Sequence, residues 1–144
     1  MKLEHIDLGD GIILDANFRE AALLAELASD AQPLVHNGMH RSYLLSPITL
    51  DGRTFRPSLY FTDGLLASVH LTWVDPETKG ASAWDGFSFD RERSIAKEDA
   101  AWLSSYLGKV ASADSTFCFN WGNVWSGFDE RSGFSSIVVR YRRA

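Results

Sequence analysis

Two aspartates that stand beside aromatic residues are the first candidates for chemistry in this chain. Asp85 follows Trp84, and Asp90 follows Phe89. Burial against aromatic rings raises the pKa of a carboxyl group, as the general acid of a glycosidase requires. However, Gly86 directly after Asp85 is typical of a turn, and Asp90 is explained as an N-cap or first-turn acid of a helix. The pair therefore does not predict a hydrolytic site.

The histidines form no catalytic or metal-binding pattern either. His36 and His40 lie four residues apart, but Asn37 and Gly38 between them disfavour a helix, so both are expected in a loop. His70 falls on the more polar face of an expected strand, where a surface or rim histidine is the ordinary case. The sequence also lacks the Gly-x-Ser-x-Gly, phosphate-loop and His-Glu-x-x-His motifs. We therefore predict no catalytic residue, no metal and no cofactor.

The composition is that of one water-soluble domain. The 144 residues are 45% hydrophobic and 23% charged, and no apolar run approaches the roughly 20 residues of a membrane span. The first residues lack the basic and apolar segments of a secretory signal, which favours a cytoplasmic protein. Cys118 lies between Phe117 and Phe119 in an apparent strand, so we expect a buried, inert thiol. The expected organisation is a single domain over residues 1–144 without membrane contact.

The charge of the chain is unevenly distributed. The formal net charge is −5, and the last fourteen residues hold four arginines and no acid, so residues 1–130 carry −9. An acidic body argues against nucleic acid as a partner, because phosphate contacts require a basic surface. The same field speeds the encounter with a basic protein. A protein partner is therefore more compatible with the charge than a nucleic acid.

Two helices are expected from periodicity and capping signals. Asn17 and Glu20 fit a capping box, which starts a helix whose apolar positions run to residue 28. A second helix is expected over residues 91–107, with apolar residues at helical spacing and Gly108 placed to cap its end. Its other face is expected to be solvated and carries Lys97, Glu98, Asp99 and Ser105.

Much of the remaining chain has the period of two that is typical of strands. Asp51-Gly52 and Asp63-Gly64 supply the positive φ of tight hairpins between runs of alternating apolar residues. The clearest strand spans residues 65–74. Further strands are expected at residues 3–8, 12–14, 42–45, 48–50, 54–61 and 81–87. These elements predict an α+β fold, with a curved antiparallel sheet of about five to seven strands and two main helices packed on it.

Aromatic residues are frequent near the C-terminus. Residues 117–121 alternate as in one strand, and residues 137–141 alternate as in another. Gly122 follows the first run and is typical of a bulge or a turn. We therefore expect residues 121–129 to form an aromatic loop between two strands.

The rings of this loop have two interpretations. Trp125 and Phe128 either plug the end of the sheet or stay exposed beside the acidic Asp129 and Glu130. Exposed aromatic residues with an acidic rim have the composition of a protein-binding hot spot. On that interpretation the candidate partner-binding residues are Trp84, Asp85, Trp125, Phe128, Asp129 and Glu130.

The same stretch resembles a known class of protein. The string Phe-Asn-Trp-Gly-Asn-Val-Trp-Ser-Gly-Phe-Asp-Glu-Arg-Ser-Gly at residues 119–133, followed by Ser136, Ile137 and Tyr141, looks like the C-terminal signature of small bacterial cytosolic proteins. Residues 61–66 and Trp102-Leu103 are similar to the middle portion of such proteins. In size and acidity they resemble immunity proteins, which neutralise toxins delivered between bacteria, including effectors of type VI secretion.

The resemblance implies a cytoplasmic immunity protein that is not an enzyme. It would bind a cognate toxin and occlude the active site of that toxin. An alternative is a small-ligand-binding protein or enzyme that has a cleft between sheet and helices, with His70 or Asp85 as acid or base. A third hypothesis is a homodimer that pairs through the same aromatic residues.

Overall fold

The structure is a computed structural model that describes residues 2–27, 29–75, 88–129, 131 and 134–142. Within these residues the chain forms two helices and ten strands. The expectations for Trp84, Asp85 and Glu130, and for a short strand at residues 81–87, lie outside the described residues. In chain order the elements are β1 (Ile6–Gly9), β2 (Ile12–Leu14), α1 (Glu20–Glu26), β3 (Gln32–Asn37), β4 (His40–Leu44), β5 (Ile48–Leu50), β6 (Arg53–Thr62), β7 (Leu65–Trp73), α2 (Phe89–Leu107), β8 (Thr116–Phe119), β9 (Gly122–Asp129) and β10 (Phe134–Tyr141).

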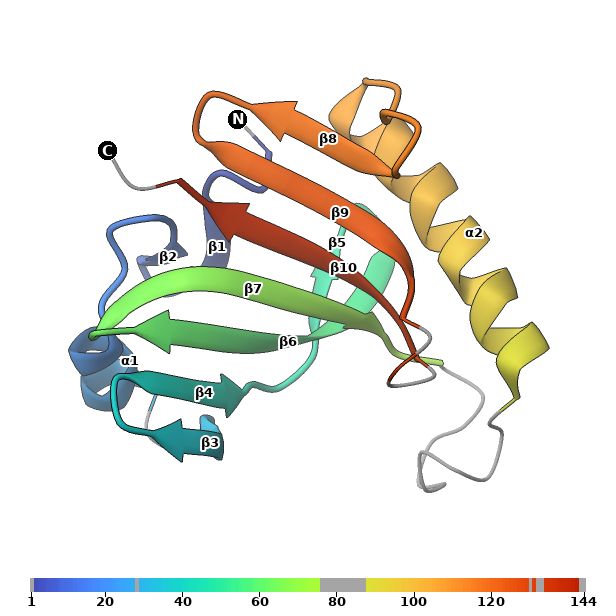
Figure 1. Ribbon diagram of the computed structural model, residues 1–144. Helices are drawn as coiled ribbons and strands as arrows, with labels where there is room; N and C mark the ends of the chain where they lie inside the picture. Colours follow the sequence, from blue (N-terminus) through green and yellow to red (C-terminus); the bar gives the residue numbers. More distant parts are fainter. Residues whose placement is uncertain (1, 28, 76–87, 130, 132–133, 143–144) are drawn as a thin grey trace.

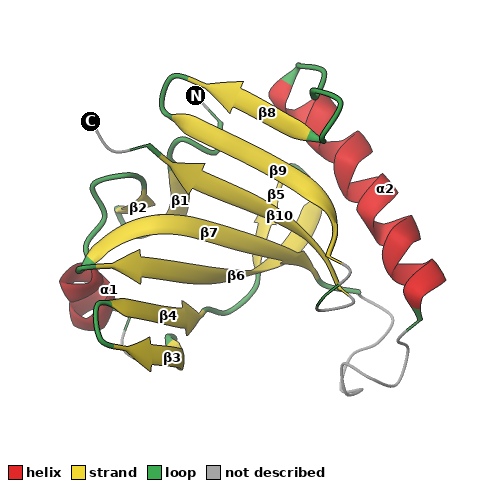
Figure 2. Ribbon diagram, in the orientation of Figure 1, coloured by secondary structure: helices red, strands yellow, loops and turns green. Residues whose placement is uncertain are grey.

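One large antiparallel sheet dominates the molecule. Its strand order is β3-β4-β6-β7-β10-β9-β8, and β5 pairs with β6 beyond the end of β4. A separate two-stranded hairpin is formed by β1 and β2. Figure 1 shows the curvature of the sheet, and Figure 2 shows the helices beside it in red. The α+β prediction is confirmed, and the described sheet has more strands than the five to seven expected.

The core lies between one face of the sheet and the elements packed on it. Leu23 of α1, Leu103 of α2 and Ile6 of β1 are buried there. The inward residues of the central strands complete this cluster, among them Leu59, Val69, Val124, Ile137 and Val139. No described helix crosses the other face of the sheet, which is turned toward the viewer in Figure 1. This uncovered face is called the outer face below. No helix within the described residues is long and apolar enough to cross a membrane.

The aromatic loop expected at residues 121–129 is mostly a strand. Residues 122–129 form β9, which pairs with β10 along its whole length and with β8 over its first half. Gly122 starts this strand instead of interrupting it. Its φ is 156°, and a Cβ atom at this position would lie 2.0 Å from the Arg140 carbonyl oxygen. The glycine therefore marks a close approach of two backbones, which sequence alone does not distinguish from a turn.

The N-terminal half differs from expectation in two places. The capping box is wrong, because α1 begins at Glu20 with Arg19 as its N-cap and no side-chain capping bond. Glu20 instead accepts a hydrogen bond from the Tyr43 hydroxyl and lies 3.6 Å from the Arg41 guanidinium. The expected loop around His36 and His40 is a hairpin of β3 and β4, so these two histidines stand on adjacent strands.

The second predicted helix is confirmed, but the prediction of its solvated face is wrong at Asp99. Ser88 caps the N-terminus of α2 by accepting from the Arg91 amide, and Gly108 ends it with φ 64°. Asp99 is fully buried, because it falls on the apolar stripe between Ile95 and Leu103. Its Oδ1 atom accepts from both Nε and a terminal nitrogen of Arg53, at 3.1 and 2.7 Å.

Candidate functional site

The register of the sheet brings three side chains into one row on the outer face. Val138 of β10 stands opposite His70 of β7 on one side and opposite Trp125 of β9 on the other. The neighbouring row contains Ser68, Arg140 and Asn123 from the same three strands. Because directly paired residues of antiparallel strands project to the same face, both rows project outward together.

The indole of Trp125 has a defined place on this face. A Cβ atom at Gly127 would lie 2.6 Å from the indole carbon Cζ2 of Trp125. Gly127 is the next residue of β9 on the same face, so the ring lies over the glycine backbone, where any other residue would place a side chain. The indole is half-buried although no described element covers it. Trp125 is therefore held by its own strand in an orientation that leaves part of the ring accessible.

His70 lies in a less polar environment than a surface histidine. Its ring centroid is 4.2 Å from that of Tyr60, a residue of β6 that also belongs to the outer face. Burial, and to a smaller extent the positive charge of Arg140, together lower the pKa of His70 to about 4. The imidazole is therefore neutral near pH 7, and its half-buried place along the outer concavity agrees with the rim position expected for it.

Arg140 supplies the positive charge of this region. The residue is exposed, and its guanidinium forms no ion pair with any residue that the structure describes. His70 beside it is neutral and adds no second positive charge. An accessible arginine without a counterion presents several donors in a fixed fork, which fits a carboxylate or another planar anion.

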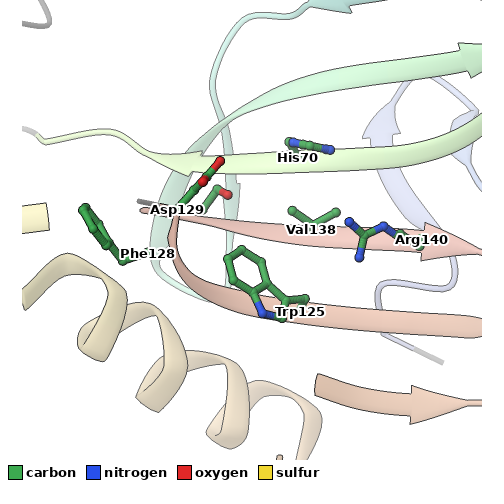
Figure 3. Close-up of a pocket in the computed structure, with 7 residues that line it drawn as sticks. His70, Trp125, Phe128, Asp129, Val138 and Arg140 are labelled. Atoms are coloured by element: carbon green, nitrogen blue, oxygen red, sulfur yellow. The ribbon is translucent and has the colours of Figure 1, made fainter. Parts of the chain in front are cut away.

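These side chains surround a shallow concavity of about 390 Å³, shown in Figure 3. Val138 forms its floor and is only 4% exposed. Asp129 stands at one end, where its carboxylate accepts the Arg131 backbone amide at 2.9 Å. The lining residues are His70, Trp125, Phe128, Asp129, Ser136, Val138 and Arg140. The positively charged Arg140, the negatively charged Asp129 and the indole of Trp125 therefore line the same concavity.

The described members of the predicted site, Trp125, Phe128 and Asp129, all line the outer concavity. Phe128 differs from the other two because its side chain points toward α2 in Figure 3. Its ring centroid is 5.9 Å from that of Phe89, and the Arg93 guanidinium lies 5.0 Å from it. Phe128 thus anchors the helix to the end of β9, whereas Trp125 is available to a partner.

Sequence reasoning missed the other members of this site. The alternation of β7 placed His70 on the more polar face, and the alternation of residues 137–141 leaves Arg140 opposite their apolar face. Local sequence does not predict that β10 pairs with β7, because these two segments are far apart in the chain. Tyr60 joins the cluster through the pairing of β6 with β7.

A second concavity lies between the sheet and α2, on the core side. It measures about 630 Å³ and is lined by residues 51–54, Trp73, Val74 and Trp102. The Arg53 guanidinium lies 5.0 Å from the Trp73 ring and is fixed from behind by the buried Asp99. The second carboxylate oxygen of Asp99 is buried without a hydrogen-bond partner. Burial raises the pKa of Asp99 to about 6, against the opposing effect of Arg53.

Neither concavity contains an activated nucleophile or a metal centre. Among the described residues no group of three or more His, Cys, Asp or Glu side chains could hold a metal ion. Cys118 is exposed on β8, so the expectation of a buried thiol is wrong. The chain matches no protein-family model, no curated protein and no solved structure. The described side chains are therefore the basis for assigning a function, and their arrangement suits binding.

Proposed function

We propose that this protein is a binding protein of the immunity type, which holds a cognate antibacterial toxin or effector against its outer face and occludes the active site of that toxin. The observation that carries the proposal is the gathering on the outer face of Trp125 and Arg140, which line the concavity, and of Tyr60, whose ring contacts His70. Tyr, Trp and Arg are the residue types that dominate binding energy at protein interfaces. The resemblance of residues 119–133 to small immunity-type proteins supports the same proposal.

The charges suggest what the toxin presents to this face. Arg140 has no ion pair among the described residues, so an Asp or Glu side chain of the toxin is the expected contact. The chain as a whole carries −5, which favours a toxin that is basic overall and speeds its approach. The toxin is thus proposed to be a basic protein that inserts one acidic side chain beside Trp125.

The interaction needs no chemistry on the immunity side. A half-buried indole that is already oriented by Gly127 loses little conformational freedom on binding. The neutral His70 contributes a hydrogen-bonding ring without a second positive charge. Inhibition follows if the toxin surface that docks here includes or adjoins its catalytic cleft.

The proposal is tested by capture and by growth. Tagged wild-type protein and the Trp125→Ala and Arg140→Glu variants are used to capture partners from lysate of the source cells. A captured protein is then expressed alone and together with each variant in a sensitive host. Wild type is expected to restore growth, and each variant to bind the toxin more weakly by about 2 kcal/mol or more.

The matched control for Arg140→Glu is Lys97→Glu on α2. Lys97 is exposed, and the substitution changes the net charge by the same amount on a different element. It is expected to leave toxin binding and protection unchanged. A toxin that binds Arg140→Glu and Trp125→Ala as tightly as wild type, while all variants stay folded, would refute the outer face as the docking surface.

A second candidate function is favoured by the concavity beside α2. Trp73, Trp102 and the fixed guanidinium of Arg53 line a cleft between sheet and helix, as expected for a small-ligand-binding protein or enzyme. The buried, unpartnered oxygen of Asp99 behind Arg53 is the specific observation in its favour. His70 lies on the opposite face of the sheet and cannot serve this cleft. A ligand screen that raises the melting temperature of wild type but not of Trp73→Ala would support it.

A further inference from the structure

The strand β3 forms an exposed edge of the large sheet that carries no Asp, Glu, Lys or Arg. All six of its residues are exposed. Leu34 is 44% exposed, Val35 is 54% exposed, and Met39 in the following turn is 54% exposed. In the described sheet β3 is terminal and pairs with β4 alone. Its outer backbone groups and these three side chains together are called the β3 edge below.

The opposite edge of the same sheet is protected. The Thr116 carbonyl oxygen of β8 accepts from both the amide and the hydroxyl of Ser112, each at 2.9 Å. The Cys118 carbonyl oxygen accepts from the Lys109 ammonium at 2.9 Å. These bonds occupy alternate carbonyls along β8, which are the groups that an added strand would need. Strand addition is therefore open at the β3 edge and obstructed at β8.

The charge of the β3 edge identifies the partner that it fits. Residues 32–39 contain no Asp, Glu, Lys or Arg, although the chain as a whole carries −5. Two copies of an acidic protein repel each other, and a surface without ionised side chains minimises that repulsion. Natural proteins usually protect exposed edges with lysines or other charges, which are absent from β3. Pro33 and the bulge beside it limit the pairing to the second half of the strand.

We propose that the β3 edge pairs with the β3 edge of a second copy of this chain, in antiparallel orientation. The two sheets then form one continuous sheet across a two-fold axis. In such a symmetric pair the axis passes through the second half of β3, so Leu34 lies a little off the axis and Val35 lies beside its own copy. An apolar side chain at that point packs against itself, whereas a charge would meet the same charge.

This arrangement has a geometric consequence for the outer faces. The two-fold axis between antiparallel strands runs perpendicular to the sheet, so both copies turn the same face to the same side. The two concavities around Trp125 then open on one side, and the helices of both copies lie on the other. A dimer could hold two partner molecules side by side without either interface overlapping the β3 edge.

The test is the mass of the purified protein in solution. Light scattering and sedimentation velocity are run from low to high micromolar concentration on wild type and on Leu34→Lys and Val35→Lys. Wild type is expected to show twice its 16.0 kDa chain mass at the upper concentrations. Each lysine is expected to raise the dissociation constant of the dimer by about tenfold or more, because like charges then face or adjoin their copies.

Val110→Lys is the matched control, because Val110 is 88% exposed beyond the end of α2. It is expected to dimerise as wild type does, and so is Trp125→Ala. A wild-type chain that remains at 16.0 kDa throughout would overturn the proposal. A dimer that both edge lysines leave intact would also overturn it. Loss of toxin capture in Val35→Lys, with wild type monomeric, would assign the edge to a strand of the toxin instead.

Discussion

The Trp125 indole lies over the backbone of Gly127, two residues further along the same strand. A Cβ atom at Gly127 would approach the indole carbon Cζ2 to 2.6 Å, a distance that real structures do not tolerate. The glycine is therefore a steric requirement of the tryptophan orientation. It links a backbone position inside the predicted loop to a partly accessible aromatic ring of the outer concavity.

Gly127→Ala is expected to displace this ring. Overfilling a packed position costs typically about 1–3 kcal/mol, and the half-buried indole reduces that cost by swinging outward. We expect lower unfolding free energy and weaker toxin binding. The double variant Gly127→Ala/Trp125→Ala removes the clash, so a double-mutant cycle by chemical denaturation should show a positive coupling between the two sites. Strict additivity of the two single effects would contradict the contact.

At Gly122 of β9 a Cβ atom would lie even closer to a neighbouring atom than at Gly127. The Cβ position of Gly122 lies 2.0 Å from the Arg140 carbonyl oxygen, and that backbone cannot swing aside as a side chain does. Gly122→Ala is expected to lower the unfolding free energy by about 3 kcal/mol or more. Gly64→Ala is the comparison, because Gly64 has φ 78° with open space around it, and strain alone costs about 1 kcal/mol there. Equal losses in the two variants would show that backbone conformation, not contact, governs Gly122.

Much of the fold is accessible from local sequence, for identifiable reasons. The Asp51-Gly52 and Asp63-Gly64 turns adopt the positive φ that their residue types predict, which places β5, β6 and β7. The helix α2 follows from its apolar spacing and from Gly108 at its end. These features depend on residues close together in the chain, where residue type alone limits the conformation.

The candidate site depends on pairings that local sequence does not contain. His70 and Arg140 become neighbours because β10 pairs with β7, and nothing in either strand specifies that partner. The prediction of a turn at Gly122 fails because, in the sequence, a glycine for close approach looks the same as a glycine for a turn. One miss was avoidable, since Asp99 stands on the stripe between Ile95 and Leu103 and not on the polar face of α2.

Because Asp99 is buried, we expect its ionisation to make the free energy of unfolding depend on pH. Its pKa is about 6 in the folded protein, above the ordinary value of 3.8, so between these values the folded state binds more protons than the unfolded state. The contribution of Asp99 to stability is therefore present below about pH 4 and is lost as the pH rises toward 6. Asp99→Asn is expected to remove that fall from the pH profile of the unfolding free energy.

The control for this measurement is Asp90→Asn. Asp90 is on the same helix with a fully exposed side chain, and the same chemical change is expected to leave the fall between pH 4 and 6 in place. Only the difference in slope is diagnostic, because Asn at position 99 also leaves the Arg53 guanidinium without its carboxylate. A profile for Asp99→Asn that keeps the wild-type slope would assign the fall to other groups.

The ionisation of His70 can be followed directly by NMR titration of its ring. Its pKa is about 4 in the folded protein, below the ordinary value of 6.5, so His70 contributes stability above about pH 6.5 that is lost as the pH falls toward 4. Burial is the larger cause and Arg140 the smaller. In Arg140→Ala the pKa is therefore expected to rise by less than half of its total depression. Recovery to about 6.5 in that variant would show instead that Arg140, and not the Tyr60 contact and the sheet, keeps the outer-face imidazole neutral.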